Sequence, residues 1–370
     1  MLKIIDLFAG AGGISLGAAR AGFELTAAVE IDKFALETHQ KNFPATQHLN
    51  IDVATLSGDD LMALVGLKKG GLDGLVGGPP CQGFSYIGKR DVGDDRNNLF
   101  MHFFRLVSEI SPAFFLAENV PGILSGQYDA IREQAFSLVR GQYEMLQPIE
   151  VKASDYGAPT TRTRIFFIGY DPKRVRALTA EMFKPAENTV SVLVKDALKG
   201  LPIDINPAWL SEQSGWQPVE KMPKSHFRLA IVGRIPDNVG DPSSIERFMK
   251  RGEVSGCMGT RHGDVVKARY AALDFGEKDK ISKSVKLHPD KFCPTLRAGT
   301  GSDKGSFQAV RPIHCHAPRV ITPREAARLQ GFPDWFVFHR TKWHSFRQIG
   351  NSVSPIVSEY LLSNIIKSLV

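Results

Sequence analysis

The chain has 370 residues, of which 43% are hydrophobic and 23% charged, and its formal net charge is +7. Single cores usually stop growing near ~250–300 residues, so this length predicts one large domain and a smaller one. No stretch approaches the ~18 consecutive apolar residues of a membrane span, and we expect a soluble protein without a membrane partner.

The excess positive charge lies in one segment. Residues 171–312 contain 24 Lys and Arg and 17 Asp and Glu, whereas the remainder contains 22 of each sign. A solvated basic face and a surface for a polyanion such as nucleic acid explain this excess equally well.

The amino terminus and the cysteines indicate the compartment. The chain opens with MLKIIDLFAG, which lacks a basic leader and predicts a first strand instead of a signal peptide. The cysteines lie far apart and form no CxxC pair, which is typical of free thiols in a reducing compartment. They are Cys81, Cys257, Cys293 and Cys315. We therefore expect a cytoplasmic protein.

Residues 1–170 alternate short apolar runs with helical patterns, which predicts an α/β domain with a Rossmann-like, doubly wound, mostly parallel sheet. The expected strands are Lys3–Phe8, Leu25–Glu30, Leu72–Val76, Ala113–Glu118 and Arg164–Gly169. The expected helices are Ile14–Ala21, which ends at Gly22, and Leu99–Ile110.

Beyond residue 170 the periodicity weakens, and Pro and Gly punctuate the chain. We expect residues 171–312 to form a second, smaller, irregular domain and residues 313–370 to complete the first domain. The run Thr322-Pro323-Arg324-Glu325 predicts a capping box at the start of a helix. Ile356–Val370 predicts a final apolar helix that docks on a core.

A glycine-rich turn follows the first predicted strand. In DLFAGAGGISLG, residues 6–17, Gly10 and Gly12 precede a helix, and Glu30 ends the next strand. Such glycines let the backbone approach a ligand, and an acid at that position can accept ribose hydroxyls. Because Ser15 replaces the third glycine of the dinucleotide fingerprint, a nucleoside site and a purely structural turn are equal alternatives.

The stretch GGPPCQGFS, residues 77–85, places a cysteine at the end of another predicted strand. Pro79 and Pro80 remove amide donors, so the strand must end there and present Cys81 at the edge where α/β folds bind ligands. Most cysteines simply pack in a core, but this rigid turn favours a nucleophile.

Two further motifs end or begin predicted strands. Glu118, in AENVP, lies at the same edge as Cys81 and is a candidate acid, although a structural strand-end carboxylate is the alternative. In TTRTR, residues 160–164, we expect only one of Arg162 and Arg164 to face this edge and the other to pair with an acid.

The chain contains, in this order, FAGAGG, PPCQGFS, ENV, the Arg-x-Arg pair, TPREAARLQGFP and QIGNSVSP. These motifs resemble those of the DNA (cytosine-5) methyltransferases, and together they span nearly the whole chain. The resemblance implies the S-adenosylmethionine-dependent methyltransferase fold, with residues 171–312 as the target recognition domain. It implies a bacterial modification enzyme that acts as a monomer on double-stranded DNA, beside a separate restriction endonuclease.

The resemblance also implies roles for the residues. Cys81 would attack C6 of a flipped-out cytosine, Glu118 would act at N3, and Arg164, supported by Arg162, would hold O2. The residues expected around S-adenosylmethionine are Phe8, Gly10, Gly12, Glu30, Ile31, Asp52, Pro80, Leu99, Asn351, Ser352 and Val353. The residues expected to contact DNA are Gln82, Ser85, Thr295 and Arg297.

One position departs from the family, because Thr160 stands where its members have Gln, which leaves the role of that side chain open. Cys293 and the run His314-Cys315-His316 have no usual zinc spacing, so we expect no metal. A tRNA-directed relative and an inactive DNA-binding regulator are the alternatives. The long 171–312 segment argues against the first, and the intact Cys81, Glu118 and Arg164 argue against the second.

Overall fold

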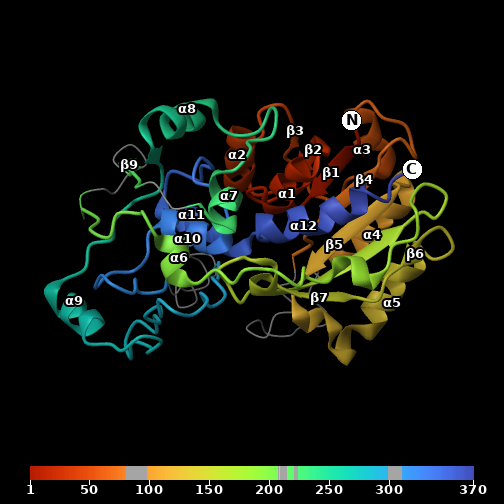
Figure 1. Ribbon diagram of the computed structural model, residues 1–370. Coiled ribbons are helices and arrows are strands. Elements are labelled where there is room, and N and C mark those ends of the chain that lie inside the picture. The colour runs from red at the N-terminus through yellow and green to blue at the C-terminus, as the bar shows by residue number, and fades with distance from the viewer. Residues whose placement is uncertain (81–97, 207, 209–214, 221–223, 299–310) are drawn as a thin grey trace.

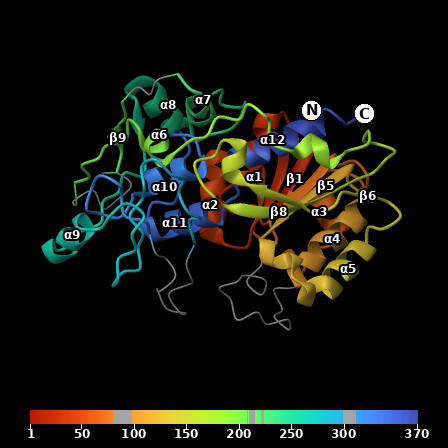
Figure 2. The ribbon, with the colours of Figure 1, turned by 60° about the horizontal axis from the view of Figure 1, so that its bottom comes forward.

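The computed structural model describes residues 1–80, 98–206, 208, 215–220, 224–298 and 311–370. In Figure 1 the sheet and the helices that cover it lie at the right, and a lobe of short helices and loops lies at the left. The two chain ends lie near each other beside the sheet (Figures 1 and 2). Among the described helices, none is both long enough and apolar enough to cross a membrane.

Within the described residues, eight strands form the main sheet in the order β3-β2-β1-β4-β5-β8-β6, and β7 also pairs with β8. The strands from β3 to β5 are parallel, whereas β6, β7 and β8 pair in antiparallel fashion. Their bounds are β1 Lys3–Leu7, β2 Glu24–Val29, β3 Gln47–Leu49, β4 Gly74–Gly77, β5 Phe114–Asn119, β6 Glu144–Met145, β7 Ile149–Lys152 and β8 Thr163–Tyr170. The predicted α/β, mostly parallel fold is confirmed.

Helices cover both faces of the sheet (Figure 2). The helices of the first 170 residues are α1 Gly13–Ala21, α2 Lys33–Asn42, α3 Gly58–Leu64, α4 Asn98–Ile110 and α5 Asp129–Ser137. Because strand side chains alternate between faces, Ile4 packs with α1 while its neighbour Ile5 packs with α3 and α4. The second face is rich in aromatic rings, in which Phe104 contacts Phe100 and Phe115.

The carboxy-terminal helix α12, Pro355–Ile366, docks on α1 next to the sheet. A Cβ on Gly17 would lie 2.1 Å from Ser358 Oγ, so only glycine allows this approach. Ser358 Oγ also donates to the carbonyl of Gly13, 2.8 Å away. The predicted final helix is therefore confirmed, although it ends at Ile366 and not at Val370.

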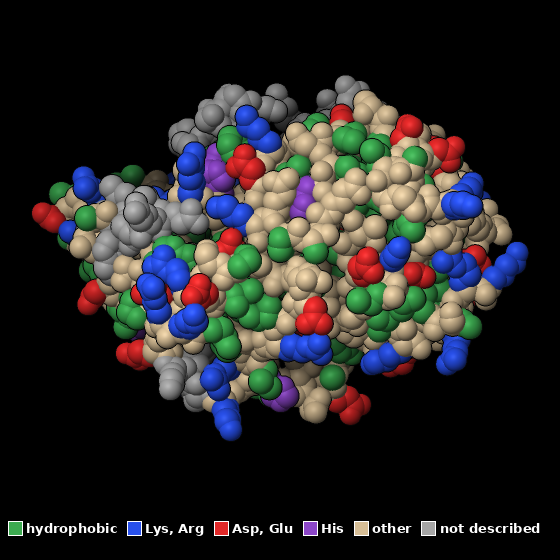
Figure 3. All heavy atoms as spheres, turned by 90° about the horizontal axis from the view of Figure 1, so that it is seen from above, with side chains coloured by type: hydrophobic (Ala, Val, Ile, Leu, Met, Phe, Trp, Pro, Cys, Tyr) green, Lys and Arg blue, Asp and Glu red, His purple; other side chains and the backbone are tan. Residues whose placement is uncertain are grey.

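The lobe contains short elements separated by loops, as the weak periodicity predicts. They are α6 Val194–Leu198, α7 His226–Val232, α8 Pro242–Arg251 and α9 Asp264–Ala271, with a two-stranded sheet of β9 Gln217–Pro218 and β10 Glu253–Val254. Figure 1 places α9 farthest from the main sheet. On the face shown in Figure 3, Lys and Arg side chains are interspersed with acidic and apolar ones.

The lobe and the sheet share one apolar core. Phe227 of α7 and Val254 of β10 belong to the same buried cluster as Ile4 of β1. Two helices of the carboxy-terminal segment, α10 Pro323–Gln330 and α11 Lys342–Asn351, lie between them (Figure 1). Thr322 and Glu325 form the predicted capping box of α10. The domain boundaries at residues 170 and 312 stay a prediction.

Candidate active site

Three parallel strands end at the same edge of the sheet. Leu7 of β1 pairs with Gly77 of β4, and Gly77 pairs with Ala117 of β5. The glycine-rich turn, the Pro79-Pro80 turn and the end of β5 therefore meet at the carboxyl edge, where α/β sheets bind ligands. The sequence predicted that the Pro79-Pro80 turn and Glu118 lie at one edge; the register agrees and adds the glycine-rich turn.

Glu118 and Arg164 form an ion pair at this edge. Arg164 Nε lies 2.6 Å from Glu118 Oε1, and both side chains are largely buried. The antiparallel pairing of β5 with β8 brings them together, since Asn119 lies opposite Ile165. Such a pair holds the carboxyl group of Glu118 in a fixed orientation beside the guanidinium of Arg164, which is a hydrogen-bond donor.

The turn that follows β4 packs against Glu118. A Cβ on Gly78 would lie 2.9 Å from Glu118 Oε2, so the carboxylate approaches the backbone of this turn closely. Asn119 Nδ2 donates weakly to the carbonyl of Pro79 at 3.5 Å. Cys81, two residues after Pro79, lies outside the described residues, as do the predicted DNA contacts Gln82 and Ser85.

Arg162 has a different environment from Arg164. The residue is only 3% exposed, and its guanidinium donates to the carbonyls of Gly350 and Asn351, at 2.8 and 3.1 Å. We expected one arginine to face this edge and the other to pair with an acid; Arg164 faces the edge and pairs with Glu118, while Arg162 donates to these backbone carbonyls. β8 begins at Thr163, so Arg162 precedes the strand and turns toward α11.

The glycine-rich turn has the backbone of a ligand cradle. Phe8, Gly10 and Gly12 all have positive φ, at 57°, 57° and 97°. A Cβ on Gly12 would lie 2.4 Å from the Phe43 ring, and one on Gly13 would lie 2.3 Å from the carbonyl of Val353. The turn is therefore held open by contacts that only glycine permits, with the α1 amino terminus directly behind it.

Glu30 lies beside this turn at the end of β2. Its two carboxylate oxygens accept from the amides of Gly10 and Asp32, both at 2.8 Å. Burial raises its pKa above the ordinary value, while these amides oppose that shift. A carboxylate accepts about four hydrogen bonds, so both oxygens retain capacity for ribose hydroxyls.

The other predicted cofactor residues of the first 100 residues are exposed or half-buried. Ile31 is 64% exposed, which is unusual for an isoleucine and leaves an apolar surface next to Glu30. Asp52 is exposed, and its carboxylate accepts from the amide of Ala54 at 2.9 Å. Pro80 and Leu99 are half-buried, at the two ends of the undescribed segment 81–97.

The carboxy-terminal motif reaches the turn from the opposite side. Val353 contacts Gly13, as above, and the Ser352 carbonyl accepts from Gln330 Nε2 at 2.7 Å. Asn351 is exposed at the end of α11. These contacts bring a segment more than 300 residues away in sequence to the glycine-rich turn.

Of the predicted recognition residues, Thr295 and Arg297 are exposed and Leu296 between them is buried. This segment is anchored to the residues before β8, because Cys293 N donates to the carbonyl of Pro159, and Thr161 N donates to that of Cys293, both at 2.9 Å. Thr160, the departure from the family, is fully buried beside Cys293 and accepts from Arg162 N at 3.3 Å.

Residues 2–367 match the family model described as C-5 cytosine-specific DNA methylase. The chain belongs to this family. The methylase is 39% identical over 99% of its length to the Type II methyltransferase M.XorII of Xanthomonas oryzae pv. oryzae, of which 84% is covered. It is 33% identical over 98% of its length to M.DdeI of Desulfomicrobium norvegicum, of which 88% is covered. The predicted enzyme class, a DNA cytosine-5 methyltransferase, is confirmed.

Solved structures agree with the fold of the methylase. A prophage-encoded E. coli protein assigned as a DNA modification methyltransferase superposes with a TM-score of 0.90 and 53% identity, covering 100% of this chain and 99% of the other. The Dnmt2 methyltransferase of S. pombe gives a TM-score of 0.63 at 18% identity and 99% coverage of both chains, which shows the fold alone.

The methylase also contains a buried polar network that sequence reasoning missed. Ser15 Oγ donates to Asp6 Oδ2 at 2.5 Å, His39 Nε2 lies 2.9 Å from Ser15 Oγ, and His39 Nδ1 lies 2.9 Å from His48 Nε2. Burial raises the pKa of Asp6 to about 7 and lowers that of His39. The signal in the sequence was Ser15 at the third glycine position; nothing in it pointed to the histidines.

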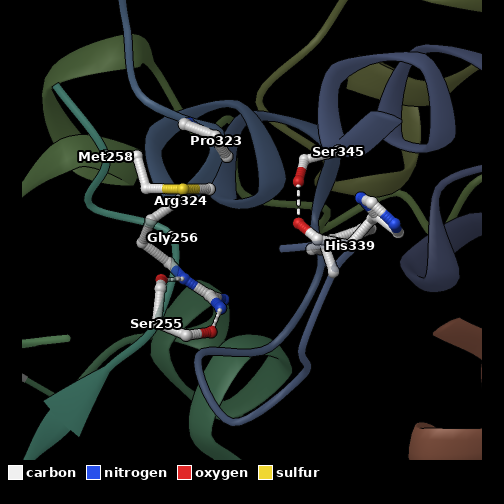
Figure 4. Close-up of a pocket in the computed structure, with 8 residues that line it drawn as sticks. Ser255, Gly256, Met258, Pro323, Arg324, His339 and Ser345 are labelled. Atoms are coloured by element: carbon white, nitrogen blue, oxygen red, sulfur yellow. Dashed lines mark hydrogen bonds between the residues drawn. The ribbon is translucent and has the colours of Figure 1, made fainter. Parts of the chain in front are cut away.

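Two cavities lie in or beside the lobe of the methylase. The first, of about 10 Å³, lies beside Arg324 and has room for about one water molecule (Figure 4). There Arg324 Nε donates to the carbonyl of Ser255 at 2.8 Å, which ties α10 to the lobe. The second, of about 670 Å³, is lined by His314, Cys315 and His316 among others. Among the described residues, no three of His, Cys, Asp and Glu gather as a metal site.

Proposed function

We propose that this methylase transfers a methyl group from S-adenosylmethionine to C5 of a flipped-out cytosine within a specific duplex DNA sequence. The observation that carries this proposal is the Glu118–Arg164 ion pair, packed against the turn that leads directly into Cys81. A carboxyl group and a guanidinium at one edge can together bind the N3 and O2 side of a cytosine ring.

The methyl donor fits the glycine-rich edge. The positive-φ turn from Phe8 to Gly12 leaves room for a ligand backbone, and Glu30 is fixed by two amides so that it can accept ribose hydroxyls. Exposed Ile31 offers an apolar surface for an adenine ring, and Asp52 would accept from its amine. The donor supplies an electrophilic methyl group and leaves as S-adenosylhomocysteine.

The residues of the chain would make C5 reactive. The Cys81 thiolate would form a bond to C6 while the electron pair of the C5–C6 double bond shifts to C4–C5 and that of the C4–N3 double bond shifts to N3, which gives an enamine with a nucleophilic C5. Glu118 would deliver a proton to N3 and so compensate the charge that develops there, while Arg164 would donate to O2. After methylation, loss of the C5 proton to a base, return of the N3 proton to Glu118 and departure of the Cys81 thiolate would restore the aromatic ring.

The base must leave the duplex, because neither C5 nor C6 is accessible to a thiol within the stack. We propose that residues 171–312 bind the duplex, with Thr295 and Arg297 on the exposed segment and Gln82 and Ser85 in the segment after Cys81. This assignment is supported by the location of the excess positive charge in residues 171–312.

The names of the relatives support a biological role. M.XorII and M.DdeI are Type II methyltransferases, and we propose that this methylase likewise acts as the modification enzyme of a restriction-modification system. It would work as a monomer in the bacterial cytoplasm, and a separate restriction endonuclease would cut the same target when unmethylated.

The test is to incubate the purified chain with labelled S-adenosylmethionine and unmethylated genomic DNA, and to sequence the product after bisulfite conversion. Protected cytosines within one short recurring sequence are expected, and they would also identify the target. Cys81→Ala should abolish labelling while retaining DNA binding. Label in tRNA but not in DNA would show that tRNA, and not DNA, is the substrate. Methyl transfer by purified Cys81→Ala would overturn the mechanism.

A further inference from the structure

We infer that Arg162 is a positioning residue that couples recognition of target DNA to binding of the methyl donor. The inference rests on the proposed function, since it assigns Thr295 and Arg297 to DNA and Asn351 to the donor. Arg162 itself is 3% exposed and therefore cannot contact either ligand over any large area.

The guanidinium of Arg162 joins two segments that are distant in sequence. Its Nη1 donates to the carbonyl of Gly350 at 2.8 Å and lies 3.4 Å from the carbonyl of Leu296, and its Nη2 donates to the carbonyl of Asn351 at 3.1 Å. One rigid, planar group thus touches the recognition segment and the start of the donor segment at once.

A second set of contacts brings these segments together. A Cβ on Gly350 would lie 2.7 Å from the amide nitrogen of Ala298 and 2.8 Å from the carbonyl carbon of Arg297, so α11 and the recognition segment are in direct backbone contact. Cys293 is bound by backbone hydrogen bonds to Pro159 and Thr161. The recognition segment is therefore held between the residues before β8 and the end of α11.

The contacts of Arg162 lie close in the chain to the edge that holds Glu118 and Arg164. Arg162 is two residues before Arg164, whose side chain pairs with Glu118. If DNA binding moves Thr295 or Arg297, the displacement is transmitted to Gly350 and Asn351 through the guanidinium, because closely packed segments cannot move independently. Donor binding must then change DNA affinity by the same factor, since coupling between two binding equilibria is reciprocal.

The experiment measures this coupling directly. The dissociation constant of S-adenosylhomocysteine, which cannot react, is determined with and without a saturating duplex that carries the mapped target. In the wild type we expect the duplex to change donor affinity by about fivefold or more, within the usual range for coupled sites. Arg162→Lys replaces the planar, forked guanidinium with a single ammonium group, which cannot reach all three carbonyls at once. This variant should reduce the coupling factor toward one.

A matched control is Arg174→Lys. Arg174 donates to the carbonyls of Ser111 and Leu72 at 3.2 and 3.0 Å, so it also joins distant segments, but at the opposite end of the sheet. It should retain the wild-type coupling. A coupling factor unchanged in Arg162→Lys, or lost equally in Arg174→Lys, would overturn the inference.

A second variant keeps the test informative if Arg162→Lys folds poorly. Gly350→Ala pushes the recognition segment away from α11 without removing a charge, and it should also reduce the coupling factor; wild-type coupling in this variant would contradict the inference. Wild-type methyl transfer is measured first, because its absence would refute the proposed function, whereas methyl transfer without coupling would refute only the role of Arg162.

Discussion

Arg164 and Glu118 approach within 2.6 Å across two antiparallel strands, at the edge where the parallel strands end. β5 and β8 provide the rigid support, since both are largely buried and each has paired strands on both sides. A site on strands is held more precisely than a site on loops, so the two groups are arranged before any ligand binds.

Glu118→Gln tests the role of this carboxyl group. Glutamine retains the shape of the side chain beside Arg164, but it cannot deliver a proton to N3, and we expect kcat to fall by more than ~10²-fold with DNA binding retained. Single-turnover methyl transfer measures this. Glu133→Gln, which removes the surface partner of Arg140 on α5, should leave kcat unchanged. Equal losses in both variants would contradict the assignment.

Asp6→Asn tests the buried network through its pH dependence. The pKa of Asp6 is raised from 3.8 to about 7 by burial, so the folded protein retains a proton that the unfolded chain has lost between these pH values. Folding stability from this group is thus fully present below about pH 4 and is lost as pH rises toward 7.

We expect Asp6→Asn to gain stability relative to the wild type as pH rises, by about 1.4 kcal/mol per pH unit at most and with no further change above about pH 8. Urea unfolding of both proteins near pH 5 and pH 8 measures this difference, and shifts of the His39 pKa largely cancel in it. Asp237→Asn on the surface is the control. A difference that is independent of pH would show that Asp6 titrates normally.

Arg328→Met tests how α10 holds the lobe. Arg328 binds Asp334 through two hydrogen bonds of 2.7 Å and also donates to the carbonyl of Lys199 after α6, and both charged side chains are buried. Removal of one partner leaves a buried charge, which should cost about 3–5 kcal/mol in the free energy of unfolding.

The control and the double variant separate the possible causes. Lys250→Met removes an exposed ion pair with Glu246 and should cost less than about 1 kcal/mol. Arg328→Met combined with Asp334→Leu should recover part of the loss, because no buried charge remains. If the double variant is as unstable as the single one, the loss of stability comes from the lost contact with the Lys199 carbonyl and from lost packing, and not from the unpaired carboxylate of Asp334.

The sequence predicted β1, β2, β4, β5 and β8, the helices α1, α4, α10 and α12, and the edge where the motifs meet, because each depends on near neighbours in the chain; it missed the short strands β3, β6 and β7 and the helices α2, α3 and α5. Apolar alternation, the Gly22 cap and the Thr322 capping box are local patterns with local causes. Strand ends in a parallel sheet then place the glycine-rich turn and Glu118 on the same side. The family resemblance supplied the order of these motifs.

The tertiary structure alone decided how distant residues meet. Arg162 and Arg164 look equivalent in TTRTR, yet the start of β8 at Thr163 sends one to α11 and leaves the other with Glu118. His39 meets Ser15 only because the end of α2 lies against the glycine-rich turn at the start of α1. Such contacts depend on how whole helices and strands pack together, and a short run of residues does not indicate which distant residues it will contact.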